Sequence, residues 1–239
     1  MKRLISPEQM NKQILYIGMA VMLPSLVSTD SHANGESYGN ITIASDYLFR
    51  GVSQTQGGPA LQGDLGWATD SGFYVGTWAS NVDGFADVEW DFYAGYDISL
   101  AHGTTLNLTA QYYTYHGREI SGADYAEVYV GLTQELDNMS VGARVEFAPE
   151  YFGEDTRQVY FKLFGSIPLA GAWSVEAHIG RLNFSDNALA GQPDTSDWML
   201  GISYAHDPFT VTAAFADTNW DECGSDCNTN AILAVGLDF

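Results

Sequence analysis

Residues Val88 to Ser99 alternate between an apolar set and a more polar set of side chains. Successive side chains of an extended strand point to opposite faces, so such a segment has two different faces. The apolar face holds Val88, Trp90, Phe92, Ala94, Tyr96 and Ile98, and the other holds Glu89, Asp91, Tyr93, Gly95, Asp97 and Ser99. The alternation predicts a half-buried β-strand with an unusually continuous apolar face.

The same alternation recurs in about twelve segments, with turn residues between them. The first runs from Gly39 to Phe49, with Ile41, Ile43, Tyr47 and Phe49 on one face and Thr42, Asp46 and Arg50 on the other. The twelve segments are 39–49, 60–68, 73–80, 88–99, 106–113, 126–132, 139–147, 159–163, 173–179, 198–204, 209–215 and 231–239. The repetition excludes a helical protein and predicts an all-β fold.

The connections between the segments alternate in length. Tight turns follow the even-numbered segments, as at Asp70-Ser71-Gly72, His102-Gly103, Asp137-Asn138, Ala170-Gly171 and Asp207-Pro208. Longer connections rich in Gly and Asp follow the odd-numbered ones. Short turns at one rim and long loops at the other are typical of a transmembrane antiparallel up-and-down β-barrel with an even number of strands. We therefore expect periplasmic turns and extracellular loops.

Both ends of the chain indicate export to a bacterial outer membrane. Lys2, Arg3 and Lys12 precede an apolar run, 14–27, which is followed by Ser31-His32-Ala33. This pattern predicts a secretory signal peptide over residues 1–33, with a single barrel domain over 34–239. The last residues, AILAVGLDF, place Ala231, Leu233, Val235, Leu237 and Phe239 on one face. Such an ending resembles the signal that the outer-membrane assembly machinery reads in Gram-negative bacteria.

The charge of the chain limits its partners. The sequence carries 30 acidic and 9 basic side chains, for a net charge of -21. This surplus repels phosphate backbones, so we expect no nucleic-acid partner. Hydrophobic residues make up 46% of the chain, which excludes a disordered protein. The expected partners are membrane lipid, the assembly machinery and a small solute.

Hydrocarbon decides which face of each strand points outward. Arg or Lys on the lipid face at the bilayer midplane costs about 2–4 kcal/mol, so the charged face must line the lumen. The candidate lumen and selectivity residues are Asp46, Arg50, Asp64, Glu89, Asp91, Asp97, Glu127, Arg144, Glu146, Lys162 and Glu176. The apolar face carries aromatic residues near segment ends, typical of interfacial girdles: Trp67, Trp90, Tyr112, Phe147, Trp173, Trp198 and Phe209.

Two interpretations of this lumen remain open. A water-filled interior with more acids than bases favours cations over anions. Alternatively, acids and bases pair in a network that fills a narrow barrel, since a twelve-stranded barrel lies between packed and open ones. Inward Tyr74, Trp78, Tyr93, Tyr113, Tyr129 and Tyr160 either fill the lumen or stack on a sugar-like or aromatic solute.

Arg50 ends the first predicted strand, next to a loop that contains Gly51, Gly57 and Gly58. A guanidinium has five fixed donors, so Arg50 could hold this loop inward through carbonyls or an acid such as Asp64. It could also bind a substrate carboxylate at the pore mouth. The structural role is the favoured interpretation.

Cys223 and Cys227 lie in the loop before the last segment. In an oxidising compartment a disulfide is the default prediction, and we expect no metal and no cofactor. Asp217, Asp221, Glu222 and Asp226 lie nearby but lack the spacing of an EF-hand.

An enzyme is a third possibility, since some barrels of this size hydrolyse lipids. That chemistry needs a serine activated by a histidine on the outer face. Among the histidines, His178 alone falls in mid-strand, on the lumen face beside Glu176. We therefore expect no catalytic residues.

Several stretches resemble the TorF-type porin family. They include Ile41 to Gly84, with FRGVSQT at Phe49 to Thr55, PALQG at Pro59 to Gly63 and GTWASNV at Gly76 to Val82. The sequences DVEWDFYAGY at Asp87 to Tyr96 and DYAEVYVGL at Asp124 to Leu132 also match. The resemblance implies an outer-membrane channel of undefined substrate. We expect passive uptake of small solutes with a cation preference, or a non-conducting barrel that acts as a surface or structural protein.

Overall fold

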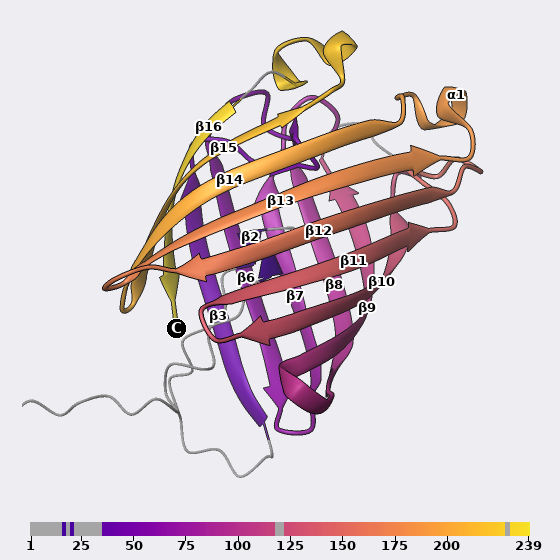
Figure 1. Cartoon of the computed structure of the whole chain (residues 1–239). Helices are drawn as coiled ribbons and strands as arrows, with labels where there is room; N and C mark the ends of the chain where they lie inside the picture. The colour runs from indigo at the N-terminus through magenta and orange to yellow at the C-terminus, as the bar shows by residue number, and fades with distance from the viewer. Residues whose placement is uncertain (1–15, 18–19, 22–34, 118–121, 228–229) are drawn as a thin grey trace, which may run out of the picture.

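Twelve antiparallel strands form a closed barrel in a computed structural model of the chain (Figure 1). The structure describes residues 16–17, 20–21, 35–117, 122–227 and 230–239. The barrel strands, in chain order, are β3 (Gly35–Ala44), β6 (Ala60–Thr69), β7 (Phe73–Asn81), β8 (Val88–Ser99), β9 (Thr104–His116), β10 (Tyr125–Leu136), β11 (Met139–Ala148), β12 (Gln158–Pro168), β13 (Trp173–Phe184), β14 (Thr195–His206), β15 (Phe209–Thr218) and β16 (Asn230–Asp238). Each strand pairs with its neighbours in sequence, so the predicted up-and-down barrel is confirmed.

The last strand closes the barrel by pairing with the first. β16 runs antiparallel to β3, with Ala234 opposite Ala44 and Asp238 opposite Asn40. Phe239 continues the seam, because its backbone N–H donates to the Gly39 carbonyl over 2.9 Å and the Gly39 N–H donates back over 2.8 Å. Closure satisfies the backbone groups of both edge strands, which lipid could not do.

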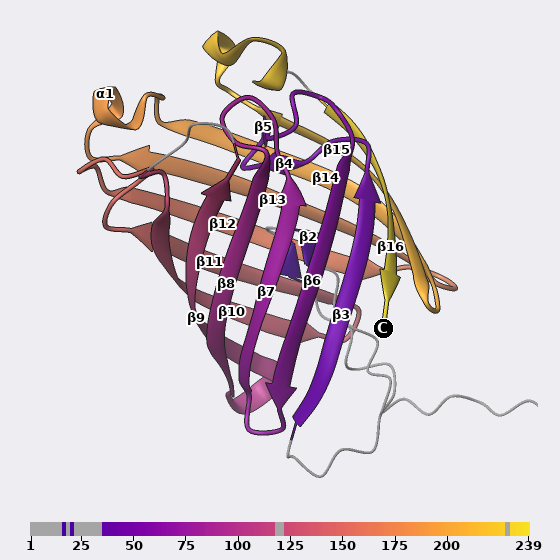
Figure 2. The ribbon, with the colours of Figure 1, turned by 180° about the vertical axis from the view of Figure 1, so that it is seen from behind.

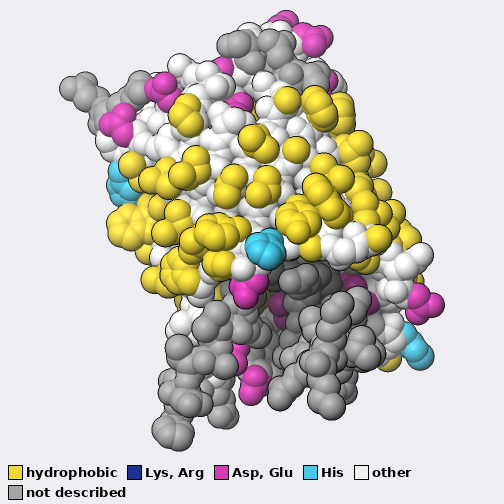
Figure 3. Space-filling model, turned by 90° about the vertical axis from the view of Figure 1, so that its left-hand side faces the viewer, with side chains coloured by type: hydrophobic (Ala, Val, Ile, Leu, Met, Phe, Trp, Pro, Cys, Tyr) yellow, Lys and Arg dark blue, Asp and Glu magenta, His cyan; other side chains and the backbone are white. Residues whose placement is uncertain are grey.

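The outer face of the barrel is apolar, as predicted. Large side chains such as Ile43, Ile179 and Phe215 are 57% to 62% exposed there. Figure 3 shows a band of hydrophobic side chains across the side of the wall in view, with acidic groups above and below it. Trp90, Trp173 and Trp198 are 41% to 45% exposed on this face. Such a surface belongs in hydrocarbon, and a closed barrel that presents it belongs to the bacterial outer membrane.

The two rims differ as the sequence predicts. Short connections such as Asp70–Gly72 and Asp137–Asn138 join the strands at one rim, where η2 (Ala101–Gly103) also lies. The opposite rim carries the long loops, with α1 (Asn187–Ala190) and η3 (Asp221–Cys227). Asp186 caps α1, accepting hydrogen bonds from the Ala188 and Leu189 N–H groups. The C-terminus lies at the short-turn rim (Figure 1), so this rim is the periplasmic one.

The prediction for the first strand is wrong at its C-terminal end. The strand stops at Ala44, and the chain then forms a small hairpin of β4 (Leu48–Phe49) and β5 (Val52–Ser53) near the loop rim (Figure 2). Tyr47 and Phe49 were predicted to face lipid, but Tyr47 is 3% exposed and packs inside against Trp78. Alternation fails here because a bend and a tight hairpin interrupt the strand.

Most of the predicted leader lies outside the described residues. Within it, β1 (Tyr16–Ile17) pairs with β2 (Ala20–Val21). The cleavage site at Ala33 also lies outside them and stays a prediction. In the described part of the chain, no helix has the length and apolar character needed to cross a membrane.

Candidate functional site in the barrel lumen

The hairpin of β4 and β5 enters the extracellular half of the lumen, where Arg50 and Ser53 are buried. We call residues 45–59, which comprise this hairpin and its flanks, the inner hairpin. Its turn residues, Arg50 and Gly51, have φ angles of 51° and 81°. Two consecutive positive φ values are characteristic of a tight hairpin turn, and glycine adopts them without steric cost. A Cβ on Gly51 would lie 2.8 Å from Thr218 Cβ and 3.0 Å from Asp197 Cβ. The turn therefore contacts the wall of β14 and β15.

Asp46 organises the base of the inner hairpin rather than the face of a strand. Its Oδ1 accepts hydrogen bonds from the hydroxyls of Ser53 at 2.7 Å and Thr55 at 2.8 Å. The Tyr47 N–H donates to Thr55 Oγ1 over 3.2 Å. Asp46 was predicted on the lumen side and is 6% exposed inside the barrel. It lies in the hairpin, however, and not in β3.

Arg50 joins the inner hairpin to the opposite wall. Its Nη2 donates to Glu127 Oε1 at 2.8 Å and to Glu146 Oε2 at 2.6 Å. Burial alone would lower the pKa of Arg50, but Glu127 and Glu146 raise it well above its usual value, so the guanidinium stays charged. The guanidinium carbon also lies 4.5 Å from the Phe49 ring centre and 4.7 Å from that of Tyr160. The predicted inward anchor is present, with acids other than Asp64.

Glu127 gathers further donors around this ion pair. The Tyr113 hydroxyl donates to it over 3.0 Å, and Gln158 also donates to it. Arg144 lies on the far side of Glu146, where its Nε donates to Oε1 over 2.6 Å. These side chains come from β9, β10, β11 and β12. We call this set of hydrogen-bonded side chains the cross-lumen network; its members are Arg50, Tyr113, Glu127, Arg144, Glu146 and Gln158. It connects four strands with the inner hairpin.

Glu89 and Asp91 face the lumen from β8, where they are 2% and 0% exposed. Gln111 Nε2 donates to Asp91 Oδ2 over 3.0 Å, and no described basic side chain forms a salt bridge with either acid. Lys162 is 1% exposed and lies beside Arg144 on the neighbouring strand. The bases gather near β11 and β12, whereas the acids of β8 face the lumen from another sector of the wall.

Asp197 belongs to the lumen but was missed by the sequence prediction. Its carboxylate accepts a hydrogen bond from the Tyr160 hydroxyl at 2.9 Å and lies 3.0 Å from His178 Nε2. The predicted segment began at Trp198, one residue after Asp197. Extending the alternation back by one position would have placed Asp197 inward, since Trp198 faces outward.

The periplasmic half of the lumen is lined by tyrosines and small polar groups. The Tyr93 hydroxyl donates to Asp64 at 2.9 Å and lies 2.9 Å from the Tyr38 hydroxyl. Asn107 bridges the Tyr74 hydroxyl at 2.8 Å and Asp97 at 2.7 Å.

Several of these rings lie over glycines of the neighbouring strand, which leave room for them: Tyr38 over Gly66, Tyr74 over Gly95 and Tyr93 over Gly76. Glu176, also in this half, accepts a hydrogen bond from Ser203 at 3.1 Å. The structure thus places every predicted lumen residue inside the barrel, divided between its two halves.

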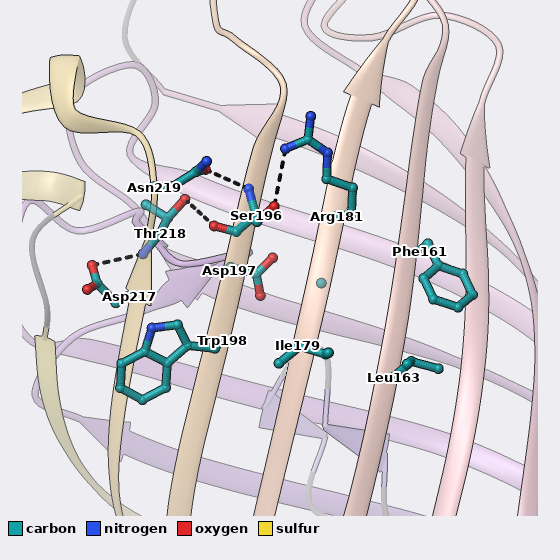
Figure 4. A pocket seen from close by; sticks show the side chains of 11 residues that line it. Phe161, Leu163, Ile179, Arg181, Ser196, Asp197, Trp198, Asp217, Thr218 and Asn219 are labelled. Atoms are coloured by element: carbon teal, nitrogen blue, oxygen red, sulfur yellow. Dashed lines mark hydrogen bonds between the residues drawn. The ribbon is translucent and has the colours of Figure 1, made fainter.

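The described surface includes a groove and a small cavity. A groove of about 520 Å³ lies on the outer wall, where Phe161, Ile179 and Trp198 surround its apolar part and Arg181 its polar end (Figure 4). A cavity of about 50 Å³ lies at the extracellular mouth. We call it the mouth pocket; it is lined by Phe49, Arg50, Val52, Gln54, Tyr115, Tyr151, Phe152, Leu182, Gln192 and Thr195. The mouth pocket lies at the extracellular end of the lumen, and the groove faces lipid.

Cys223 and Cys227 form a disulfide in η3, above the lumen. η3 lies against β5 of the inner hairpin. Among the residues that the structure describes, no group of three or more His, Cys, Asp and Glu side chains is arranged to hold a metal ion.

Solved structures that are similar in fold include two porins and an outer-membrane channel. The NanC porin aligns with a TM-score of 0.60 at 10% identity, covering 84% of this chain and 98% of its own. The KdgM porin, solved with disordered oligogalacturonate, gives 0.59 at 8% identity over 85% and 98% of the two chains. An outer-membrane channel from Pseudomonas putida F1 gives 0.53 at 10% identity, over 89% and 100%. These likenesses establish the fold.

Comparison of the sequence with known families identifies a family other than the one that the motifs suggest. No curated protein matches the chain. The resemblance to TorF-type porins stays a prediction. A family model described as "Bacterial protein of unknown function (Gcw_chp)" matches residues 30–233. Because this match spans most of the sequence, the chain belongs to the Gcw_chp family of bacterial proteins of unknown function.

Proposed function

We propose that the protein is an outer-membrane channel for passive uptake of small solutes, with a preference for cations. The observation that carries the proposal is a closed barrel whose interior holds more carboxylates than bases. Glu89 and Asp91 are buried on a sector of the wall with no salt-bridged base among the described residues. Carboxylates lining a narrow passage raise the local concentration of cations and oppose anions.

The proposed route passes between the β8 sector and the cross-lumen network. Arg50 holds the inner hairpin against Glu127 and Glu146, which makes the extracellular half the narrow part. A barrel of twelve strands lies between filled and open examples, so only a small solute would fit. Solute size would therefore be set by the inner hairpin, and solute charge by Glu89 and Asp91.

Planar bilayers provide the test. We expect the refolded chain 34–239 to give single-channel steps with a reversal potential that indicates cation preference. The double variant Glu89→Gln/Asp91→Asn should weaken that preference without preventing folding, because the amides keep the shape of the side chains and remove their charge. The matched control is Asp70→Asn in a periplasmic turn, which should leave selectivity unchanged.

The rival function is a non-conducting barrel that serves as a surface or structural protein. The burial of the inner hairpin favours it, since Tyr47, Ser53 and Thr55 are 3% to 7% exposed inside the barrel. A folded, silent barrel in the bilayer experiment would support this rival and overturn the channel.

Two further assignments belong to the same proposal. We assign no enzymatic activity, because His178 points inward to Asp197 and not to the outer face that lipid hydrolysis would use. We also propose that the assembly machinery recognises β16 together with Phe239, the residue that follows it, which is 50% exposed. Deleting Phe239 should lower the yield of folded barrel in cells, measured by heat-modifiable mobility in electrophoresis.

A further inference from the structure

The groove on the outer wall is polar at its extracellular end and apolar below. Leu163, Ile179 and Trp198 lie opposite one another on β12, β13 and β14 and form an apolar row. Two residues nearer to the extracellular rim, Arg181 and Ser196 are paired in the same way and form a polar row. The groove therefore changes from apolar to polar along the direction of the strands (Figure 4).

This gradient matches the depth of the two rows in the membrane. Leu163, Ile179 and Trp198 are 42%, 59% and 41% exposed on the outer wall, where acyl chains reach them. The polar row lies close to the extracellular ends of β13 and β14. A barrel tolerates an arginine on its outer face best near the interface, so this row lies at the level of the lipid headgroups. The groove, at about 520 Å³, has the volume of a ligand site.

Arg181 keeps hydrogen-bonding capacity for a ligand. Its Nε donates to Asn183 Oδ1 over 3.3 Å and its Nη1 to Ser196 Oγ over 3.2 Å. Its Nη2 lies 3.8 Å from Asp194 Oδ2, which is an ion pair but too long for a hydrogen bond. The side chain is 45% exposed, and the guanidinium lies at the upper end of the groove in Figure 4. A guanidinium in this position suits a phosphate, which it binds through two parallel hydrogen bonds.

The charges around the groove do not attract anions from a distance. Arg181 and the exposed Arg157 are balanced by Asp194 and Asp217, and the loops above carry further acids. Figure 4 shows the Asp217 carboxylate on the side of β15 away from Arg181. Asp197 borders the groove, but its carboxylate points into the lumen. A dissolved anion would therefore gain little here, whereas the phosphate of a lipid is kept beside Arg181 by its acyl chains.

We propose that the groove binds a phosphorylated glycolipid of the outer leaflet. One acyl chain lies along Leu163, Ile179 and Trp198, and a phosphate accepts hydrogen bonds from Arg181. Ser196 and the exposed Asn219 supply hydroxyl and amide groups for the sugar. A lipid is the occupant because the groove opens on the wall that faces hydrocarbon. A glycolipid is expected because phosphorylated glycolipid forms the outer leaflet of bacterial outer membranes. The site lies outside the barrel, so it does not depend on conduction.

Native mass spectrometry of the barrel purified in detergent would test this site by counting bound lipids. The probes are diphosphoryl lipid A, the same lipid with both phosphates removed, and phosphatidylglycerol. We expect diphosphoryl lipid A to bind most tightly. Arg181→Lys keeps the positive charge but removes the guanidinium fork, so the affinity for diphosphoryl lipid A should fall about tenfold.

A second pair of variants tests the groove itself. Ser196→Trp places a large ring in the groove and leaves Arg181 unchanged, so it should weaken lipid binding to a similar extent. The control is Leu65→Trp, which adds the same ring at a 57% exposed position on β6, in another sector of the wall. It should leave binding unchanged.

Three results would overturn the proposal. Equal binding of the phosphorylated and dephosphorylated lipids would exclude phosphate recognition. Equal binding of phosphatidylglycerol and diphosphoryl lipid A would exclude selection of a glycolipid. Undiminished binding in Ser196→Trp would show that the lipid lies elsewhere on the wall.

Discussion

The two halves of the lumen are lined by different kinds of side chain. In the extracellular half, Asp91, Glu127 and Lys162 are at most 1% exposed, and the inner hairpin fills the space between walls. In the periplasmic half, Tyr74 and Tyr93 are only partly buried, and their hydroxyls bond to polar neighbours. The ion pairs therefore lie in the extracellular half, which is closed. The periplasmic half, where these tyrosines pack over glycines, is more accessible.

Under the proposed channel function, this difference locates the step that would limit passage. Segments of a channel act as resistances in series, so the narrowest one sets the conductance. Changes in the extracellular half should therefore alter passage, whereas changes in the periplasmic half should alter mainly stability. The following predictions separate these two effects.

Removing the Arg50 side chain should have the largest effect. Arg50→Ala leaves Glu127 and Glu146 without their shared partner, and breaking a buried ion pair of this kind costs about 3–5 kcal/mol. Water and a displaced inner hairpin would relieve that cost, so single-channel conductance should rise several-fold. Arg181→Ala, on the outer wall, is the control. A folded Arg50→Ala barrel with the original conductance would show that the inner hairpin is not the constriction.

Selectivity should respond less to an acid of the periplasmic half. Glu176 is partly exposed and hydrogen-bonded to Ser203, and mobile ions screen such a charge within about 8 Å at physiological salt. Glu176→Gln should therefore shift the reversal potential less than Glu89→Gln/Asp91→Asn does. The comparison requires a gradient of potassium chloride across the bilayer. An equal shift from both variants would mean that charge acts along the whole lumen.

The sequence was sufficient to predict the barrel wall but not the loop conformation and side-chain pairing inside the barrel. Alternation in segments such as Val88 to Ser99 follows directly from the requirement that hydrocarbon meets only one face, so strand number, rims and lumen side are readable. Asp46 and Arg50 could be placed inside, yet their loop conformation depends on Gly51 and on contacts with β14 and β15. The acids that Arg50 meets, Glu127 and Glu146, lie 77 and 96 residues away in sequence. No local pattern encodes such a pairing.

Packing in the periplasmic half should affect stability without affecting passage. A Cβ on Gly76 would lie 2.3 Å from the Tyr93 hydroxyl, so Gly76→Ala must displace the ring from Asp64 and Tyr38. Overpacking of this kind costs about 1–3 kcal/mol in the free energy of unfolding. The control is Gly131→Ala, where the nearest atom would be Arg144 Cγ at 3.6 Å. Urea midpoints followed by electrophoretic mobility would compare them, and equal midpoints would show that the rings have room to move.

The disulfide in η3 should have the smallest effect, although it lies next to the inner hairpin. Cys223 and Cys227 are four residues apart, and closing so short a loop restrains the unfolded chain by about 2 kcal/mol at most. The inner hairpin is held from within by Arg50 and its two acids, so Cys223→Ser/Cys227→Ser should leave conductance unchanged. Bilayer recordings with and without reductant provide the measurement, since reductant should have no effect on the double variant. A conductance increase in that variant would mean that η3 holds the inner hairpin from above, and the ion pairs alone would no longer explain the closed half.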